Sequence, residues 1–146
     1  MTNKRYERVY TVTDYGDEPR SGVADVRGAP HAYQSVFDEE RDDWSDYYLL
    51  RLLDDETFRL AAEDWEIWQR WEVAFHEGRT SLDTHPALPE DQRRHAEIQA
   101  SLSQWLRIDP SQAVRAKAEF LADPDTKGWK VHWRLLKGHR TERLAH

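Results

Sequence analysis

The chain has 146 residues, no cysteine and a formal net charge of -7 at pH 7. Its length suffices for one domain with a hydrophobic core, and the lack of cysteine excludes thiol catalysis, cysteine-ligated zinc and disulfides. Aromatic residues make up 12% of the chain, too many for a solvated coil. No apolar run approaches the roughly 18 residues that a membrane span needs, so we expect a cytoplasmic protein without membrane contact.

The charge is distributed unevenly along the chain. Residues 1–92 contain 22 Asp and Glu against 10 Lys and Arg, whereas residues 93–146 contain 6 against 11. Such opposite charges can be satisfied within one molecule, between copies of the chain, or by a charged partner. The overall acidity argues against general nucleic-acid binding but allows a local basic site.

The first third of the chain predicts β-strands. Alternating apolar and β-branched residues, separated by turn residues at 15–19 and 28–30, predict strands over residues 6–13, 21–27, 31–37 and 47–53. The acidic run over residues 38–46 predicts a solvated loop.

Residues 54–77 predict a helix, with Asp54 or Asp55 as its N-cap and Gly78 at its exit. At 100° per residue one narrow arc is polar and is expected to face solvent; it consists of Arg59, Glu63, Glu66, Arg70 and Glu77. A second helix begins at Pro89, with an apolar set of Ile98, Leu102, Trp105 and Leu106. The short connection predicts an antiparallel helical hairpin.

In the last part of the chain, residues 112–121 are compatible with either a helix or a strand. Val114, Ala116, Ala118 and Phe120 alternate with charged residues, which favours a strand, and Trp129, Val131, Trp133 and Leu135 alternate in the same way. The predicted fold is therefore a single α+β domain over residues 1–146. Its antiparallel sheet, formed by the N-terminal strands and a C-terminal hairpin, packs against an inserted helical hairpin.

Two acids lie inside the aromatic face of the first predicted helix. The candidate ligand- or partner-binding residues there are Asp64, Trp65, Trp68, Trp71, Glu72 and His76. A carboxylate among indoles has a raised proton affinity suited to general acid catalysis, and the same groups can form a sugar-binding surface. The structural alternative is a carboxylate that accepts hydrogen bonds from an indole or pairs with an arginine.

Glu72 and His76 are one turn apart, and Asp83, His85 and His95 follow. Carboxylate and imidazole groups ligate metals, but this spacing does not match H-E-x-x-H. We therefore expect no metal site and no cofactor, and assign no catalytic residue.

A basic face is predicted near the C-terminus, opposite the tryptophans of the last hairpin. It comprises Arg115, Lys117, Lys130, His132 and Arg134, and a basic tail with Lys137, Arg140 and Arg143 continues it. This face is suited to phosphates or to an acidic protein. Because the aromatic residues of the hairpin point away from it, an acidic protein is favoured over nucleic acid.

Residues 63–78 read E-D-W-x-I-W-x-R-W-E-x-x-F-H-x-G, and residues 84–91 read T-H-P-A-L-P-E-D. This middle third of the chain resembles small uncharacterised bacterial proteins. The resemblance implies a bacterial source and carries no fold, cofactor or activity.

The sequence contains no P-loop, no G-x-G-x-x-G and no G-x-S-x-G. Its tryptophans and arginines are typical of interfaces, so the favoured function is a binding or interaction protein that self-associates or holds a protein partner through Trp44, Trp68 or Trp71. One alternative is a small ligand-binding protein or hydrolase using the carboxylates and His76. Another is nucleic-acid binding through the basic face.

Overall fold

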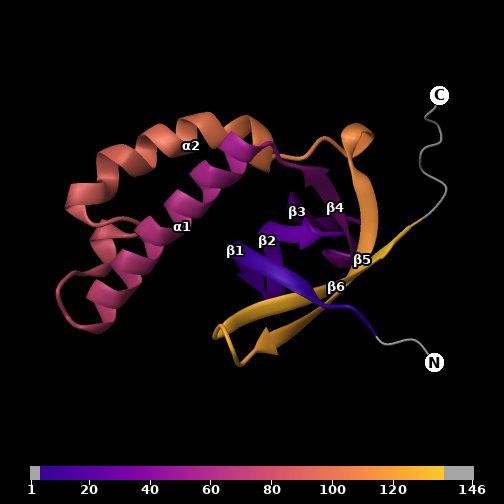
Figure 1. Cartoon of the computed structure of the whole chain (residues 1–146), viewed down its shortest axis with the longest axis horizontal. Helices are drawn as coiled ribbons and strands as arrows, with labels where there is room; N and C mark the ends of the chain where they lie inside the picture. Colours follow the sequence, from indigo (N-terminus) through magenta and orange to yellow (C-terminus); the bar gives the residue numbers. More distant parts are fainter. Residues whose placement is uncertain (1–3, 137–146) are drawn as a thin grey trace. The chain divides into compact units, whose positions relative to one another are not determined.

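The computed structural model describes residues 4–136, apart from the side chain of Leu106 (Figure 1). The basic tail with Lys137, Arg140 and Arg143 lies outside the described residues. The chain divides into two compact units, one formed by residues 1–53 and 106–146 and the other by residues 54–105. That one domain spans the chain stays a prediction.

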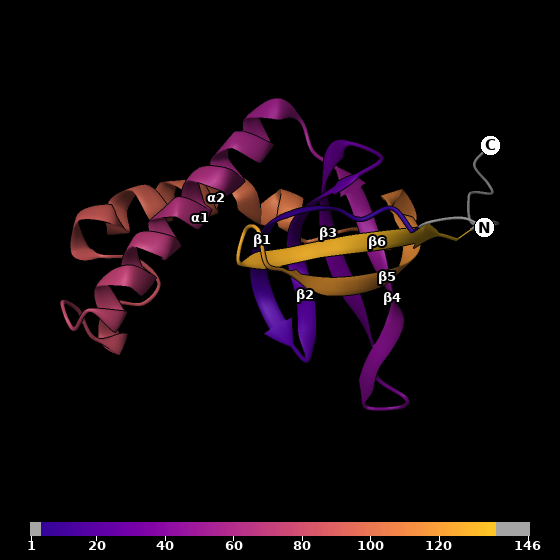
Figure 2. The ribbon, with the colours of Figure 1, turned by 60° about the horizontal axis from the view of Figure 1, so that its bottom comes forward.

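The first unit is a closed barrel of six antiparallel strands. They are β1 (Glu7–Gly16), β2 (Glu18–Val26), β3 (Ala29–Asp38), β4 (Asp43–Leu52), β5 (Val114–Asp123) and β6 (Gly128–Leu135). Each strand pairs with the next, and β6 lies between β5 and β1 because Glu7 pairs with Val131 and Arg8 with Lys130 (Figure 2). A short 3-10 turn, η3 (Pro110–Gln112), precedes β5.

This closure corrects the predicted fold. An α+β domain with an open sheet packed against a helical hairpin is wrong, since the six strands bury their shared apolar face within the barrel. The β1–β2 ladder contains three register shifts, of the kind that β-bulges produce. The predicted loop over residues 38–46 is also wrong, because β4 starts at Asp43 and only four residues form the turn. The strand alternative for residues 112–121 is confirmed by β5.

Four aromatic rings fill the barrel. Tyr33, Tyr48, Phe120 and Trp133 contact one another in all six combinations, with ring centroids 5.6 to 6.1 Å apart. Tilted and edge-on contacts of this kind are favourable beyond the burial of their area. Burial raises the pKa of the Tyr33 phenol well above its ordinary value, so the ring stays neutral.

The polar tips of these rings attach the cluster to the first two strands. The Tyr33 hydroxyl donates to the Thr11 carbonyl at 3.0 Å, and Trp133 Nε1 donates to the Asp25 carbonyl at 3.0 Å. The Tyr48 hydroxyl lies 2.7 Å from the Pro19 carbonyl. These bonds satisfy groups that are costly to bury alone, and they fix how far each ring reaches across the barrel.

The second unit contains two antiparallel helices, α1 (Asp55–His76) and α2 (Gln92–Leu106), with the 3-10 turns η1 (Leu82–Thr84) and η2 (Pro89–Asp91) between them. Asp54 caps α1 by accepting from the Thr57 amide at 2.7 Å, as predicted for this position. Trp71, Ala74 and Leu88 form a small core, with Trp68 and Phe75 packed against it. Within the described residues, neither helix is long and apolar enough to cross a membrane.

The polar arc predicted for α1 is exposed apart from the half-buried Glu63, and two of its members pair with η2 and α2. Glu63 accepts from Arg94 through both carboxylate oxygens, at 2.7 and 2.8 Å. Arg70 donates to both carboxylate oxygens of Asp91, at 3.0 and 3.1 Å. The Arg94 hydrogen bond lowers the pKa of the Glu63 carboxyl, but the exposure of the pair limits its contribution to stability.

Gly22 of β2 lies against the backbone of β1 and the Tyr33 ring, with no room for a side chain. A Cβ atom at this position would lie 2.1 Å from the Thr11 carbonyl oxygen and 2.8 Å from the Tyr33 hydroxyl oxygen. The backbone φ there is 156°. Any side chain must therefore displace backbone or the Tyr33 ring.

We expect Gly22→Ala to lower the free energy of unfolding by about 3 kcal/mol, since the core has no room for the methyl group. Urea denaturation followed by tryptophan fluorescence measures this loss. Gly28→Ala is the matched control: its φ is 82° and no atom lies within 4 Å, so only backbone strain of about 1 kcal/mol applies. Equal losses in the two variants would contradict the proposed clash.

Candidate functional site

Asp64, one of the two acids predicted inside the aromatic face, is held by α2. His95 Nδ1 lies 2.7 Å from its Oδ1, and Gln99 Nε2 donates to its Oδ2 at 2.8 Å. The Asp64 side chain is only 16% exposed. Both oxygens therefore have partners within the helical unit, which supports the structural interpretation of this residue.

The remaining candidates on α1 do not converge on one point. Trp65 and Trp68 stack on each other with centroids 4.8 Å apart. Trp71 is buried, stacks on Phe75, and donates from Nε1 to Thr84 Oγ1 at 2.8 Å. Glu72 is half-buried. The structure thus brings together the first two tryptophans and places Trp71 in the core of the unit.

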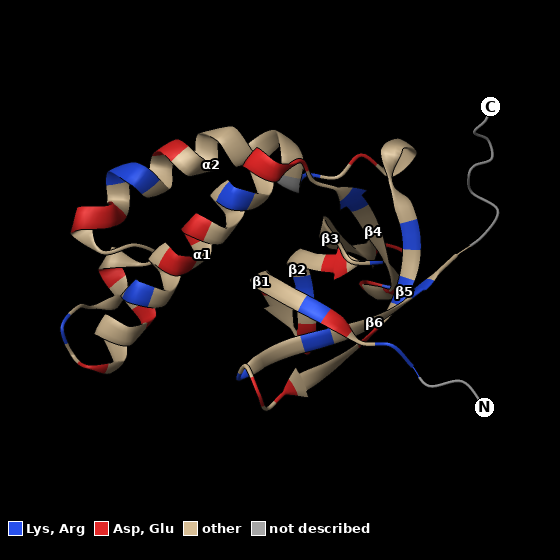
Figure 3. Ribbon diagram, viewed as in Figure 1, with Lys and Arg blue, Asp and Glu red and all other residues tan. Residues whose placement is uncertain are grey.

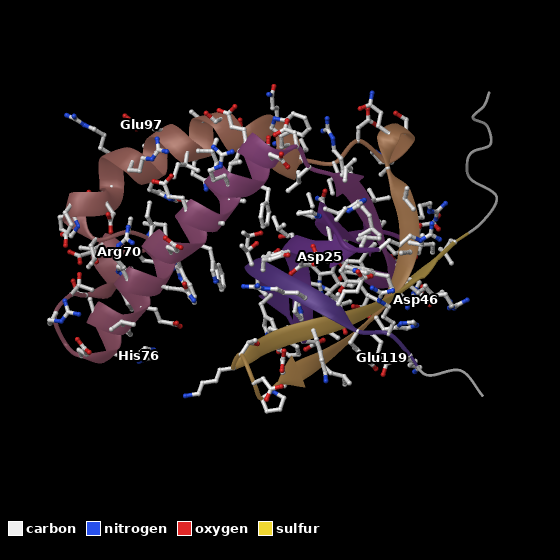
Figure 4. All side chains as sticks on the ribbon, in the orientation of Figure 1. Asp25, Asp46, Arg70, His76, Glu97 and Glu119 are labelled. Carbon is white, nitrogen blue, oxygen red and sulfur yellow. The ribbon has the colours of Figure 1, made fainter. Side chains whose placement is uncertain are left out.

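The histidines considered as metal ligands have separate surroundings. His76 lies exposed at the end of α1 (Figure 4), His85 meets the Trp71 ring edge-on at 4.6 Å, and His95 faces Asp64. Across residues 4–136, no group of three or more His, Asp and Glu side chains is arranged to hold a metal ion.

A pocket of about 290 Å³ lies at the end of the barrel formed by the β1–β2 and β3–β4 turns. Its lining comprises Asp17, Glu18, Arg20, Arg41, Asp43, Trp44, Ser45 and Asp46. Arg20 is nearly buried; its Nε donates to the Gly16 carbonyl at 2.7 Å, and its guanidinium lies 5.0 Å from the Trp44 ring. Because Nη1 also donates to Ser35 Oγ at 3.3 Å, Arg20 ties the first turn to β3. These contacts explain the burial of the Arg20 side chain by a structural role.

Three tyrosines with cations over their rings lie on the outer surface of the barrel. Arg8 Cζ is 4.6 Å from the centroid of Tyr10, Lys130 Nζ is 5.4 Å from that of Tyr6, and Arg115 Cζ is 4.2 Å from that of Tyr47. These six residues are named the tyrosine–cation stripe. They face outward because their sequence neighbours Val9, Tyr48, Ala116 and Val131 belong to the barrel core.

The stripe extends over four consecutive strands, β1, β6, β5 and β4, and it is staggered along them because Lys130 pairs with Leu121, six residues from Arg115. Arg8 and Lys130 are direct partners in the β1–β6 ladder, and Tyr47 is the partner of Lys117 in the β4–β5 ladder. The Tyr6 and His132 rings are 5.9 Å apart. Figure 3 shows the Lys and Arg positions of β1, β5 and β6 as blue bands. The structure therefore brings the predicted basic residues together with tyrosines from other parts of the chain.

Carboxylates offset part of the positive charge of this surface. Glu119 accepts from Lys4 and from the Tyr6 hydroxyl, and these hydrogen bonds lower the pKa of the Glu119 carboxyl, which keeps it charged. Asp46 lies 3.3 Å from Lys117 Nζ. Asp25 accepts from the Tyr10 hydroxyl at 3.0 Å, and all three acids are labelled in Figure 4.

The tryptophans of the last hairpin face away from the basic residues, as predicted from the sequence, but tyrosines from other segments lie beside these residues. Trp133 does point into the barrel, but the aromatic residues of the basic face come from β4 and from the segment at the start of β1. The adjacent pair Tyr47 and Tyr48 could have indicated an outward-facing tyrosine from the sequence alone, since one of two adjacent strand residues must face outward. Tyr6 and Tyr10 became identifiable only once β1 was known to pair with β6.

No protein-family model matches this chain, and the searches of curated proteins and of solved structures found no match. The resemblance to small bacterial proteins therefore stays a prediction.

We expect Asp64→Ala to lower the free energy of unfolding by about 1–3 kcal/mol, because His95 and Gln99 lose their shared acceptor. Chemical denaturation measures the change. Glu72→Ala, in the same helix, is the control: Glu72 has no hydrogen bond or ion pair within residues 4–136, and we expect a change below about 0.5 kcal/mol. If both variants were as stable as the wild type, the structural role of Asp64 would be refuted.

Proposed function

We propose that this chain is a binding protein that recognises an anionic partner through the tyrosine–cation stripe. The observation that carries the proposal is the placement of a cation over each of three tyrosine rings on the outer face of four consecutive barrel strands. Tyrosine and arginine are the residues that contribute most to binding energy in protein interfaces. A cation held over a ring also loses less freedom on binding than one on a free side chain.

The charge of the surface favours an anion. Six Lys and Arg residues lie in or beside the stripe, namely Lys4, Arg8, Arg115, Lys117, Lys130 and Arg134, and three carboxylates accompany them, those of Asp25, Asp46 and Glu119. The residual positive charge steers an acidic partner to this side of an otherwise acidic chain. The tyrosines add contact area with few rotatable bonds.

The alternative of a ligand-binding protein or hydrolase using the carboxylates of α1 receives less support. Both oxygens of Asp64 are already bound by α2. A shallow pocket of the helical unit lies beside Val73 and Leu88, and neither it nor the barrel-end pocket is lined by Asp64, Glu72 or His76.

Self-association is a second candidate, favoured by the charge of the helical unit. Residues 54–105 contain 12 Asp and Glu against 5 Lys and Arg, so this unit of one copy complements the stripe of another. Red bands along both helices mark these acids in Figure 3. Of the three tryptophans predicted for such a contact, Trp71 is buried, whereas Trp44 and Trp68 are half-buried.

The main proposal is tested on immobilised heparin, a general polyanion. We expect the wild type to be retained at low salt and the triple variant Arg8→Gln, Arg115→Gln, Lys130→Gln to elute at clearly lower salt. The control Arg59→Gln, Arg79→Gln, Arg93→Gln makes the same change in net charge at exposed positions of the helical unit. Equal elution of the two variants, or no retention of the wild type, would refute the proposal.

Self-association is tested by size-exclusion chromatography with light scattering. We expect a dimer or larger species at about 20 mM salt that dissociates at about 500 mM, because screening weakens contacts between exposed charges. A monomer at every salt and protein concentration would remove this candidate.

A further inference from the structure

We infer that the anionic partner of the tyrosine–cation stripe is single-stranded nucleic acid. The inference rests on the proposed function and narrows it to one class of partner. An acidic protein requires only cations on the surface that binds it. This surface pairs its cations with aromatic rings, and the rings are what indicate single-stranded nucleic acid.

Stacking is the first argument. Every base has a π-face that stacks on tyrosine rings or on guanidinium planes, and such stacking is insensitive to sequence. Arg115 and Tyr47 offer both kinds of plane at one point, with 4.2 Å between the guanidinium carbon and the ring centroid. Aspartate and glutamate have no ring to stack, so an acidic peptide leaves the tyrosines unused.

The layout of the stripe is the second argument. Neighbouring strands of a sheet are about 4.8 Å apart, and Leu121, the partner of Lys130, lies four residues along β5 from Lys117, the partner of Tyr47. The path from Arg8 to Tyr47 therefore spans roughly 20 Å, which at about 3.4 Å per stacked nucleotide accommodates roughly six nucleotides. Single-stranded binding sites on small barrels cover about 4–16 nucleotides, so this length falls within their range. Cations lie along the whole path, at Arg8, Lys130, Lys117 and Arg115.

A single strand fits this surface better than a duplex. The bases of a duplex are stacked on each other and expose only their edges, whereas unpaired bases can lie flat against Tyr6, Tyr10 and Tyr47. The net charge of -7 further disfavours a duplex, which presents twice the charge density of one strand.

The experiment measures fluorescence anisotropy of four labelled probes with the full-length protein. The probes are a 12-residue oligothymidine, a 12-residue oligouridine, a 12-base-pair duplex and a 12-residue polyglutamate peptide. We expect both single strands to bind more tightly than the duplex and the peptide. With about four phosphates neutralised, affinity for the single strands should fall on the order of 50-fold between 50 and 200 mM salt.

Two variants report on stacking without changing the charge. We expect Tyr47→Leu to weaken single-strand binding about 10-fold, since one stacked base is lost. The matched control, Tyr15→Leu, removes an exposed tyrosine of β1 outside the stripe and should bind as the wild type does. Arg115→Lys keeps the charge but removes the guanidinium plane, and it should also weaken binding if Tyr47→Leu proves too unstable to assay.

A third variant acts in the opposite direction. Asp46→Asn with Glu119→Gln removes the two acids that pair with Lys117 and Lys4. We expect tighter binding of the single strands, because phosphates no longer compete with carboxylates for these cations.

The outcomes separate this inference from the proposed function. Polyglutamate or duplex bound as tightly as the single strands would overturn the nucleic-acid inference while leaving an anionic partner in place. Single-strand binding unchanged in both Tyr47→Leu and Arg115→Lys would overturn it as well, because attraction would then be purely electrostatic. Failure of all four probes, together with no retention on heparin, would overturn the proposed function itself.

Discussion

The contact among four aromatic rings inside the barrel is the constraint on which the rest of the first unit depends. Tyr33, Tyr48, Phe120 and Trp133 come from β3, β4, β5 and β6, and each touches the other three. Their hydroxyl and indole groups bond to β1 and β2. All six strands are thus connected through one cluster, which gives the sheet a reason to close and leaves it no open edge.

Closure determines what the outer surface can do. Because apolar side chains of the strands turn inward, the alternate positions of β1, β6, β5 and β4 can carry tyrosines and cations. Each exposed cation–π pair contributes only about 0.5–1 kcal/mol to stability. Three such pairs add little to a fold already held by its core, so recognition is the better explanation for their presence.

The local elements could be predicted because their patterns are local. Alternation identified the strands, and the capping signal at Asp54 with the exit at Gly78 identified α1. Closure could not be predicted, since the pairing of Arg8 with Lys130 joins residues more than 120 positions apart, and no local periodicity reveals such a pairing. A sheet that closes and a sheet that stays open have the same alternation.

The candidate site was predicted only in part for the same reason. The basic residues of β5 and β6 followed from alternation, but their aromatic neighbours lie elsewhere in the sequence. Asp64 was correctly recognised as unusual among the tryptophans, although its partners His95 and Gln99 lie on another helix and convert a suspected active acid into an internal contact. Projection onto a helical wheel shows which face a side chain occupies, not what meets it.

The partners of the charged groups provide a physical criterion for separating structure from function in this chain. Arg20 and Asp64 are largely withdrawn from solvent, and hydrogen bonds to neighbouring elements account for them, as buried polar groups require. Arg8, Arg115 and Lys130 instead lie over tyrosine rings, and a ring leaves the donors of a cation available to an incoming anion. Charges of the first kind hold the protein together, whereas charges of the second kind are still able to bind.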